Sequence, residues 1–234
     1  MTAPQLASLA GLLADDTRAA FLLALLDGRA WTASELAGHA RVAPATATEH
    51  LHKLVAGGLL TERRQGRHRY VQLAGPHVAQ LIEDLTSHVE PRPGAPRTLR
   101  AATASAALTR GRTCYDHLAG KLGVAITDAL TRDGLLTQEA GFALTGRGVA
   151  WLTGTLGADL DVPGSRRPLV RGCLDWTERR QHLAGVAGAR LCRTLLDRGW
   201  IARIGSGRAV RVTPDGTRGL TQLFGDEPAW TAFA

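Results

Sequence analysis

Two groups of polar side chains in this 234-residue sequence could do chemistry, and they lie in different halves of the chain. The first group lies between Pro44 and Leu73 and mixes small polar, histidine and basic side chains. These types contact the bases and phosphates of DNA. The second group lies beyond residue 96 and combines cysteine, histidine, aromatic and charged side chains. It could bind a metal ion or a small molecule, so the elements that position each group decide what the protein binds.

The segment from Trp31 to Leu73 predicts a winged helix-turn-helix. Thr32 and Glu35 have the spacing of a capping box that starts a short helix. Pro44 fits the first turn of the second helix, and two consecutive glycines would end it. An arginine-rich hairpin, LLTERR–QGR–HRYVQL, follows. Such a unit places the N-terminal end of its second helix in the major groove of DNA.

Side chains of the second helix would contact bases, and the hairpin arginines would contact phosphates or the minor groove. Thr46 and Thr48 lie near the N-terminal end of that helix, where Ala45 could meet a thymine methyl group. Each phosphate contact would steepen the salt dependence of binding. The predicted DNA-contacting residues are Ala45, Thr46, Thr48, Glu49, His50, His52, Lys53, Arg63, Arg64, Arg67 and Arg69.

Helical patterns flank this unit and a proline-rich linker follows it. Leucines recur at helical spacing over residues 5–27, with Asp15 and Asp16 placed to cap the second part of that run. A further helix is predicted over 77–90. The linker PRPGAPR, residues 91–97, forbids a continuous helix. The sequence therefore predicts a first domain over 1–90 and a mainly α fold with small β-hairpins, of the α+β class.

Residues 6–90 contain D-x-T-R before an apolar helix, the ELA helix, the T-x-T-x-H-L second helix and the wing L-L-x-x-R-R-x-G-R-x-x-Y. Through these motifs they resemble the ArsR/SmtB family of bacterial repressors. The resemblance implies a homodimer paired through the helices at 5–27 and 77–90. It also implies a repressor that binds double-stranded DNA at a palindromic operator and leaves it when an inducer binds.

The inducer sites of this family are incomplete in this chain. The ELA helix lacks the cysteine pair with which many relatives bind soft metals. His77 and His88 keep the histidine spacing of a zinc site found in another group of relatives, but Gly75 and Pro91 stand at two of its ligand positions. His77 and His88 are therefore weak candidates for a metal site.

The second half contains an internal repeat. Residues 117–136 align without gaps with residues 182–201, and both copies begin with HLAG. Each copy continues into a short hairpin and another helix, which is the order of the later part of a winged helix. We predict a C-terminal effector or sensor domain over 98–234, built from two degenerate winged-helix-like repeats at about 112–156 and 173–224.

The second chemical group lies at the start of these repeats, in RTCYDHLAG and CLDWTERRQHLAG. The spacing predicts that Cys114 and His117 share one face of a helix, and that Asp175, Arg179 and His182 share another. The predicted effector-binding residues are Cys114, Tyr115, His117, Cys173, Asp175, Trp176, Arg179 and His182.

Three interpretations of this group are open. The histidines could hydrogen-bond within each repeat, with the cysteines as small buried hydrophobic residues. The aromatic, arginine and histidine side chains could line a small-molecule pocket between the repeats. Cys114, Cys173 and His117 could form a metal- or thiol-redox-responsive site. Cys192 falls in the middle of a helix and is predicted to pack in the core.

The charge balance favours a polyanionic partner. The net charge is +7 and the pI about 10.3, and all but two of the 28 basic residues are arginine. A high-GC coding bias would give the same enrichment in arginine. Residues 1–95 carry nine basic and nine acidic residues, whereas residues 96–234 carry 19 and 12, so the excess lies in the second half.

The remaining composition indicates a soluble cytoplasmic protein with no membrane partner. Three cysteines do not make a disulfide framework. No apolar run approaches the roughly 18 residues of a membrane helix, and the acidic N-terminus is not a signal peptide.

The sequence favours a DNA-binding transcriptional regulator over two other classes of protein. It lacks the common nucleophile, nucleotide-binding and zinc-protease motifs, so we predict that it is not an enzyme. A protein-interaction module built from degenerate winged helices is the other alternative. No cofactor is assigned by the sequence.

Overall fold

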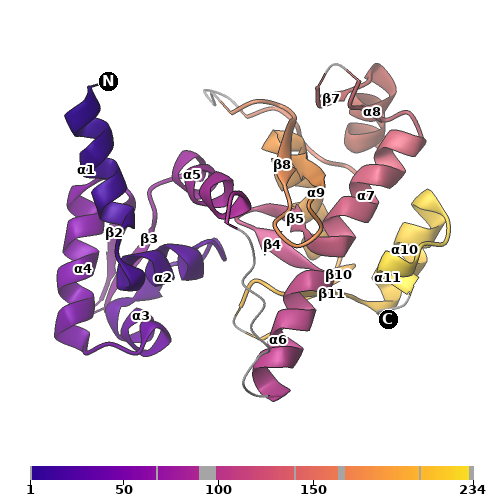
Figure 1. The fold of residues 1–234 in the computed structure, drawn as a ribbon. Coiled ribbons are helices and arrows are strands. Elements are labelled where there is room, and N and C mark those ends of the chain that lie inside the picture. Colours follow the sequence, from indigo (N-terminus) through magenta and orange to yellow (C-terminus); the bar gives the residue numbers. More distant parts are fainter. Residues whose placement is uncertain are drawn as a thin grey trace. The chain divides into compact units, whose positions relative to one another are not determined.

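The chain folds into two compact units, Met1–Leu85 and Thr86–Ala234, in a computed structural model (Figure 1). The structure describes residues 2–66, 68–89, 99–139, 141–162, 167–205 and 207–231. The predicted linker at 91–97 and Arg67 of the wing lie outside the described residues. None of the described helices is both long and apolar enough to cross a lipid bilayer.

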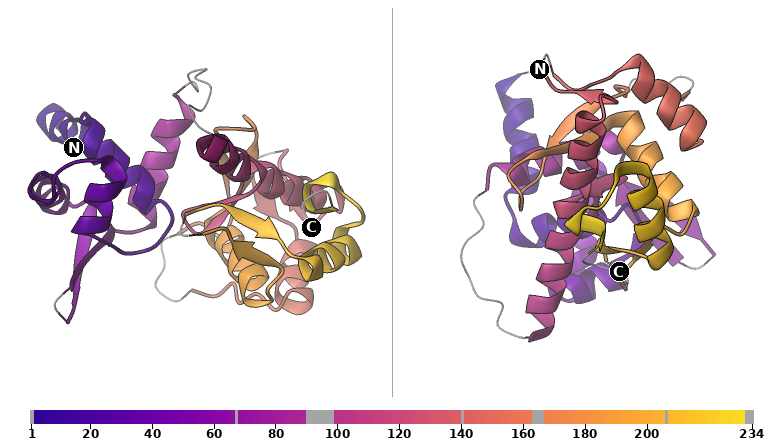
Figure 2. Two further views of the ribbon diagram at one scale, coloured as in Figure 1. Left: turned by 90° about the horizontal axis from the view of Figure 1, so that it is seen from below. Right: turned by 90° about the vertical axis from the view of Figure 1, so that its right-hand side faces the viewer.

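The first unit is a winged helix-turn-helix. Strand β3 lies between β1 and β2 in an antiparallel sheet, with Leu60 of β2 opposite Leu73 of β3. The β2–β3 hairpin projects beyond the helices of this unit (Figure 2). In chain order, the elements are α1 (Ala3–Leu13), α2 (Asp16–Leu25), β1 (Trp31–Thr32), α3 (Ala33–Ala40), α4 (Pro44–Ala56), β2 (Leu60–Gln65), β3 (His68–Leu73) and α5 (Pro76–Ser87).

Local sequence signals set these boundaries. The Asp15 carboxylate caps α2 by accepting a hydrogen bond from the Arg18 amide at 2.9 Å, so the helical run at 5–27 is two helices. The predicted capping box of α3 is confirmed: the Glu35 amide donates to the Thr32 hydroxyl, and the Thr32 amide donates to the Glu35 carboxylate. Arg41 makes the turn before α4 in a left-handed conformation, with φ of 57°.

The core of the first unit fixes the two helices of the helix-turn-helix. Residues on one face of each helix are buried, as the apolar spacing predicts. The core also includes side chains of the hairpin and of α5. Its buried residues include Phe21, Leu22, Leu25, Leu36, Ala47, Leu51, Leu54, Leu60, Val71, Val78 and Ile82.

The second unit starts at the end of α5. After helix α6 it repeats an order of hairpin, helix, hairpin and helix. A short helix, α11 (Pro228–Thr231), ends it. The first copy follows α6 (Leu99–Arg110) and contains β4 (Arg112–Cys114), β5 (His117–Ala119), α7 (Gly120–Arg132), β6 (Leu136–Thr137), β7 (Ala143–Leu144), α8 (Gly146–Ala150) and a π-helical turn η1 (Trp151–Thr155). The second copy contains β8 (Arg171–Leu174), β9 (Gln181–Ala184), α9 (Gly185–Asp197), β10 (Ile201–Arg203), β11 (Val210–Val212) and α10 (Pro214–Phe224).

Residues at equivalent positions of the two copies have the same backbone conformation and the same capping contacts. Gly134 and Gly199 follow α7 and α9 in left-handed conformations, with φ of 66° and 67°. The hydroxyl of Thr145 accepts from the Gly148 amide at the start of α8, and the hydroxyl of Thr213 does the same for α10. Each copy therefore starts and stops its helices by the same local chemistry.

The two copies interlock through one core. Helix α9 contacts β5 of the first copy, and α7 contacts β9 of the second. The Leu183 amide of β9 donates to the Thr127 hydroxyl of α7 at 2.8 Å. A Cβ atom at Gly188 would lie 2.4 Å from the Leu183 carbonyl oxygen and 3.3 Å from the His117 Cβ atom, so a glycine lets α9 approach both hairpins. Apolar residues of both copies form one cluster.

Candidate functional site

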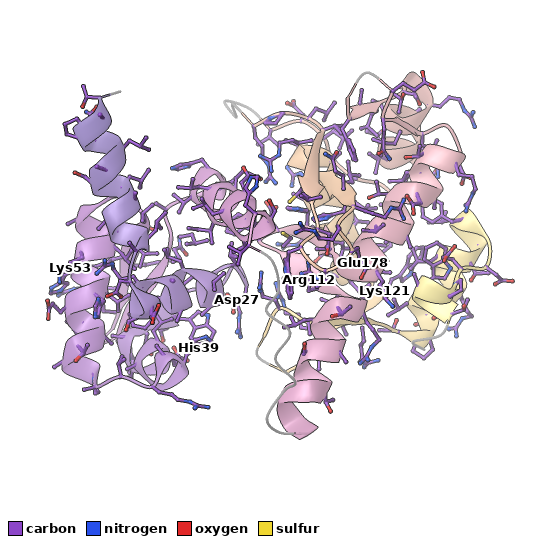
Figure 3. The ribbon with its side chains drawn as sticks, viewed as in Figure 1. Asp27, His39, Lys53, Arg112, Lys121 and Glu178 are labelled. Atoms are coloured by element: carbon purple, nitrogen blue, oxygen red, sulfur yellow. The ribbon has the colours of Figure 1, made fainter. Side chains whose placement is uncertain are left out.

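Helix α4 buries its apolar face and exposes a polar one. Ala47, Leu51 and Leu54 are buried. Pro44 begins the helix, so its N-terminal turn follows directly from the turn after α3. Lys53 projects from the outer face of α4 (Figure 3). The predicted DNA-contacting residues of α4 that are exposed are Ala45, Thr46, Glu49, His52 and Lys53.

The other predicted residues of α4 are held by neighbours. The Thr48 hydroxyl donates to the Pro44 carbonyl oxygen at 2.9 Å and is half-buried. His50 is also half-buried and faces α2: its Nδ1 atom lies 3.5 Å from the Asp15 carboxylate and 3.4 Å from the Arg18 guanidinium. Unlike its neighbours on the exposed face, His50 therefore has a packing role at the junction of α2 and α4.

Charged side chains on α4 and the wing also pair with one another. The Lys53 ammonium lies 2.8 Å from the Glu49 carboxylate, and this hydrogen bond lowers the pKa of Glu49. Arg69 donates to the His52 imidazole at 3.1 Å and pairs with Glu62. These contacts connect the wing to the exposed face of α4.

The wing exposes arginines on both of its faces. Arg63 and Arg64 are exposed and adjacent on β2, so their side chains point to opposite faces of the hairpin. Arg64 lies opposite Arg69 of β3. The two histidines proposed as a weak metal site, His77 and His88, are exposed, and neither belongs to a potential metal-binding group among the described residues.

The second chemical group forms a buried cluster, hereafter the Cys–His cluster, of Cys114, His117, Cys173 and His182. In the register of the β4–β5 hairpin, Cys114 lies opposite His117, and in that of β8–β9, Cys173 lies opposite His182. The prediction that these residues share helix faces was therefore wrong. Both stretches are hairpins: the chain reverses at residues 115–116 in the first and over residues 175–180 in the second, and each helix begins only at the glycine of HLAG.

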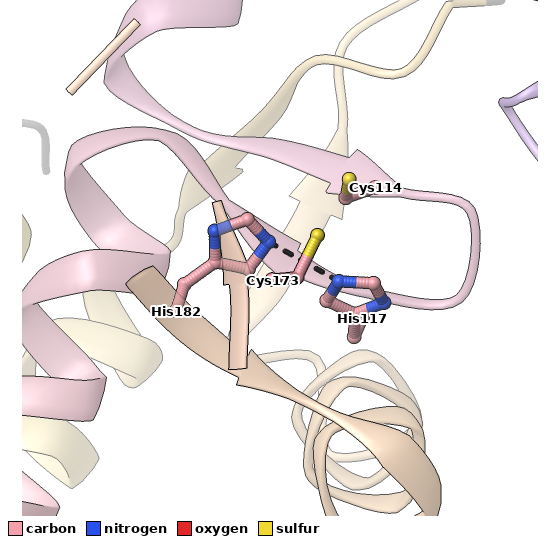
Figure 4. A group of neighbouring side chains, drawn as sticks. All are labelled: Cys114, His117, Cys173 and His182. Carbon is pink, nitrogen blue, oxygen red and sulfur yellow. Dashed lines mark hydrogen bonds between the residues drawn. The ribbon is translucent and has the colours of Figure 1, made fainter. Parts of the chain in front are cut away.

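The four side chains of the Cys–His cluster point toward a common centre (Figure 4). Their sulfur and nitrogen ligand atoms all lie within 4.8 Å of one another. The Nε2 atoms of the two histidines are 3.1 Å apart, and their rings stack with centroids 5.0 Å apart. All four residues are at most 5% exposed. The cluster is thus closed to solvent and supplied with one cysteine and one histidine by each repeat.

Hydrogen bonds favour the ionised form of one cysteine. A hydrogen bond from the Cys114 thiol holds the pKa of Cys173 far below its usual value. Burial would raise this pKa, but hydrogen bonds with His117 and His182 lower it further. Burial lowers the pKa of His182, although Cys173 opposes this. Both shifts run toward the deprotonated forms of cysteine and histidine, which are the forms that bind metal ions.

Each histidine has a carboxylate on the side away from the other histidine. Asp116 Oδ1 lies 3.4 Å from His117 Nδ1, and Asp175 Oδ2 lies 3.6 Å from His182 Nδ1. Burial raises the pKa of Asp116, but hydrogen bonds from Arg167 and His117 outweigh it and lower this pKa to about 2. Burial also opposes ionisation of Asp175, yet the Arg112 charge and hydrogen bonds from Thr177 and Gly120 keep its pKa low.

Asp175 also joins the two repeats. Its carboxylate accepts from the Arg112 guanidinium at 2.8 Å and from the Gly120 amide at 2.6 Å. Neither Arg112 nor Asp175 is exposed. Arg112 lies in the interior of the second unit (Figure 3), donates to the Leu108 carbonyl oxygen and lies over the Trp176 ring. A buried charge pair therefore holds the first hairpin against the turn of the second.

The remaining predicted effector residues lie around the Cys–His cluster. Tyr115 occupies the β4–β5 turn with φ of 58°. Arg179 occupies the β8–β9 turn with φ of 55° and donates to the Ser87 carbonyl oxygen at 2.9 Å. Cys192 lies in the core of the second unit, as predicted, where burial raises its pKa to about 12.

The sequence prediction missed Arg112, Arg167 and Thr177. One signal could have found Arg112: both copies read R-x-C before H-L-A-G, as Arg112-Thr-Cys114 and Arg171-Gly-Cys173. Two residues separate cysteine from histidine in the first copy, and eight do so in the second. A gap-free alignment therefore cannot superpose the two cysteines. Nothing in the local sequence signals that Arg167 pairs with Asp116, because 50 residues lie between them.

Known proteins resemble both the first unit and the whole chain. Residues 13–63 match a family model described as a helix-turn-helix domain. The uncharacterized HTH-type transcriptional regulator YdfF of Bacillus subtilis is 38% identical over 215 residues, which cover 91% of this chain and 94% of that protein. The HTH-type transcriptional regulator KmtR of Mycobacterium tuberculosis is 37% identical over 92 residues, or 39% of this chain and 70% of that protein.

Solved structures match the winged helix-turn-helix region. The cadmium metal-sensor CmtR from Mycobacterium tuberculosis is 31% identical and covers 40% of this chain and 96% of its own, with a TM-score of 0.32. The homodimeric winged helix-turn-helix domain of Mb0332 from Mycobacterium bovis is 30% identical. It covers 37% of this chain and 83% of its own, with a TM-score of 0.34.

Proposed function

Because this chain belongs to the ArsR/SmtB family of helix-turn-helix transcriptional regulators, we propose that it is a homodimeric repressor whose C-terminal unit senses an effector. In this proposal the dimer binds a two-fold-symmetric operator, and the effector releases the DNA. The observation that carries the DNA-binding role is the exposed polar face of α4 next to the exposed arginines of the wing. Such a regulator would act in the cytoplasm and would not be an enzyme.

The proposed DNA contacts follow from the exposed residues. Ala45, Thr46 and Glu49 lie toward the N-terminal end of α4, which enters the major groove first in helix-turn-helix docking. Arg63 and Arg64 would contact phosphates, because the hairpin projects beyond the helices and guanidinium groups suit phosphate oxygens (Figure 2). Thr48 and His52 would contribute to DNA binding through their side-chain contacts: Thr48 donates to the Pro44 carbonyl oxygen, and His52 accepts from Arg69 of the wing.

Exposed apolar side chains support the homodimer. Helix α1 has no buried residue, and its Leu6 is 58% exposed. Leu85 of α5 is also exposed. Exposed apolar groups on these two helices would be covered if a second copy packed against them, which is the pairing that the family resemblance implies.

The experiment measures DNA binding by the full chain at several salt concentrations, with DNA from the region upstream of its own gene. We expect a discrete complex at low salt. Replacing both Arg63 and Arg64 with alanine should weaken binding to all sequences and reduce the slope of log K against log salt by about 2. Replacing Thr46 with alanine should instead change the base preference.

The matched control is Arg193→Ala, which removes an exposed arginine from α9 and leaves the wing intact. Its salt slope should equal that of the unsubstituted chain. An unsubstituted protein that forms no discrete complex at low salt, or a double variant with an unchanged slope, would contradict the proposed DNA contacts.

A further inference from the structure

We infer that Cys114, His117, Cys173 and His182 form a binding site for one tetrahedral transition-metal ion, that Zn²⁺ fits it best, and that this ion is the effector. The role of the ion as effector rests on the proposed function, whereas the binding site itself does not. The argument uses the donor set, the distances, the orientation of the histidines and the charge of the cluster.

The donor set fits zinc. Two thiolates and two imidazoles in a closed, four-ligand site are a common set for tetrahedral Zn²⁺. Here each hairpin supplies one cysteine and one histidine from directly opposite strand positions. Hairpin strands are rigid, so the two pairs of ligands are positioned before an ion arrives.

The distances between the ligand atoms are close to those of a tetrahedral site. Zinc–nitrogen bonds of about 2.0–2.1 Å place two nitrogen ligands roughly 3.3 Å apart, and zinc–sulfur bonds of about 2.3 Å place two sulfur ligands roughly 3.8 Å apart. The two Nε2 atoms lie 3.1 Å apart, and no pair of the four ligand atoms exceeds 4.8 Å. Movements of about 1 Å or less would therefore complete the site.

When both imidazoles are neutral, the surroundings of the two histidines conflict unless a cation lies between them. If both Nδ1 atoms carry hydrogen and face Asp116 and Asp175, then two Nε2 lone pairs face each other at 3.1 Å. The alternative for a neutral pair is that the Nε2–H of one ring donates to the Nε2 atom of the other. The Nδ1 atom of the donor ring then carries no hydrogen, and its lone pair faces the lone pairs of the carboxylate. The Nδ1 atom of His182 indeed has no hydrogen-bond partner.

A metal ion removes this conflict. Both Nδ1–H groups can then face their carboxylates, and both Nε2 lone pairs can bind the ion. Asp116 and Asp175 are thus positioning residues, which orient the imidazole rings and select their tautomers. Arg167 holds the first of these carboxylates, and Arg112 holds the second.

The charge of the loaded cluster suits its burial. One Zn²⁺ ion, two thiolates and two neutral imidazoles have a net charge of zero, which lowers the cost of burying them. When the ion binds, the cysteine thiols lose their hydrogens as protons to solvent, and each sulfur forms a bond to the metal. Among the described residues, the group of potential metal ligands comprises these four buried side chains, which matches a closed, four-coordinate site.

The β8–β9 hairpin connects this site to the C-terminal end of α5. Its strands carry Cys173 and His182, and its turn carries Arg179, which donates to the carbonyl oxygen of Ser87. Ser87 belongs to the second unit and is the last residue of α5, and the same helix continues back into the first unit. Occupancy of the site can therefore change how firmly the end of α5 is held.

The binding site is tested with Co²⁺ added to the reduced, metal-free full chain, without DNA. We expect one Co²⁺ per chain, with the intense visible bands of tetrahedral cobalt and a thiolate-to-cobalt charge-transfer band. Zn²⁺ should displace it. Cys173→Ser and His182→Gln should lose these bands, whereas Asp116→Asn should keep them and weaken affinity by about 10- to 100-fold.

Cys192→Ser is the matched control, because Cys192 is also buried but lies outside the Cys–His cluster. Its cobalt spectrum should equal that of the unsubstituted chain. The inference is overturned if the reduced, unsubstituted chain gives no tetrahedral spectrum, or if the spectrum survives loss of Cys173 in a variant whose circular dichroism is unchanged. It is also overturned if the isolated native protein carries a Cys114–Cys173 disulfide and takes up no metal after reduction.

The effector role is tested separately by DNA affinity with and without Zn²⁺. We expect Zn²⁺ to weaken operator binding at least tenfold. In Arg179→Ala this effect should be smaller, although the cobalt spectrum is retained. If Co²⁺ binds and DNA binds but Zn²⁺ leaves the affinity unchanged, the effector role is wrong and the site stands. If no DNA complex forms under any condition, the proposed function fails instead.

Discussion

The residues that we propose to carry function lie in two regions of opposite character. The polar face of α4 and the wing is exposed, and it comes from one continuous stretch of chain, 44–73. The Cys–His cluster is buried, and its two cysteines are 59 residues apart in the sequence. Exposed side chains can contact a large partner such as DNA, whereas the buried cluster suits a small ligand that it can surround.

The two regions also differ in the interactions that hold them in place. Local signals such as the capping box of α3, the turn before α4 and the glycine after it position α4. The Cys–His cluster depends on contacts between the repeats, including the Arg112–Asp175 ion pair and the Leu183–Thr127 hydrogen bond. Substitutions should therefore affect the two regions in different ways and by different amounts.

The largest effect is expected for Asp175→Ala. This change leaves the buried Arg112 guanidinium without its carboxylate and should destabilise the second unit by about 3–5 kcal/mol. Hydrogen exchange of α7 and α9 amides should accelerate, while amides of α4 keep their protection. Asp128→Ala is the matched control, since it breaks the exposed Arg180–Asp128 pair and should cost at most about 1 kcal/mol. Equal costs for the two variants would contradict the role of the buried pair.

Metal removal should have the next largest effect. If the Cys–His cluster holds Zn²⁺, free zinc at 100 times its dissociation constant stabilises the second unit by about 2.7 kcal/mol, and a chelator removes this amount. Thermal unfolding followed by the tryptophans, four of which lie in the second unit, would measure the loss. Cys192→Ser should show the same dependence on zinc. A Cys173→Ser variant that keeps this dependence would contradict the site.

A smaller effect is expected for Thr32→Ala. The variant loses the N-cap of α3 and should destabilise the first unit by about 1 kcal/mol. The cobalt spectrum of the second unit should not change. Denaturant unfolding followed by Trp31, the tryptophan of the first unit, measures this cost. A change in the cobalt spectrum would show that the two regions are not positioned independently.

The smallest effect on stability is expected for Lys53→Ala. The side chain is exposed and its partner Glu49 is exposed as well, so the unfolding midpoint should not change. The salt slope of DNA binding should fall by about 1 if Lys53 contacts a phosphate. Arg193→Ala again serves as the control. An unchanged slope would remove Lys53 from the proposed DNA contacts.

Much of the fold could be predicted from the sequence because its signals are local. Thr32 and Glu35 lie three residues apart, and Asp15 caps a helix that begins at the next residue. The repeat was visible because HLAG and the later glycines keep one spacing. The hairpins at the start of each repeat were mistaken for helices, because a spacing of three residues fits a helix face as well as a tight turn.

The sequence by itself determined the winged helix-turn-helix, its exposed basic wing and the family to which the chain belongs. It also identified all four residues of the Cys–His cluster among eight candidates. Only the tertiary structure decided that these four meet, that His50 faces α2, and that Arg112 and Asp175 form a buried pair. The physical reason is separation along the chain: caps and turns act within a few residues, whereas the cluster forms only when two interlocked repeats bring their hairpins together.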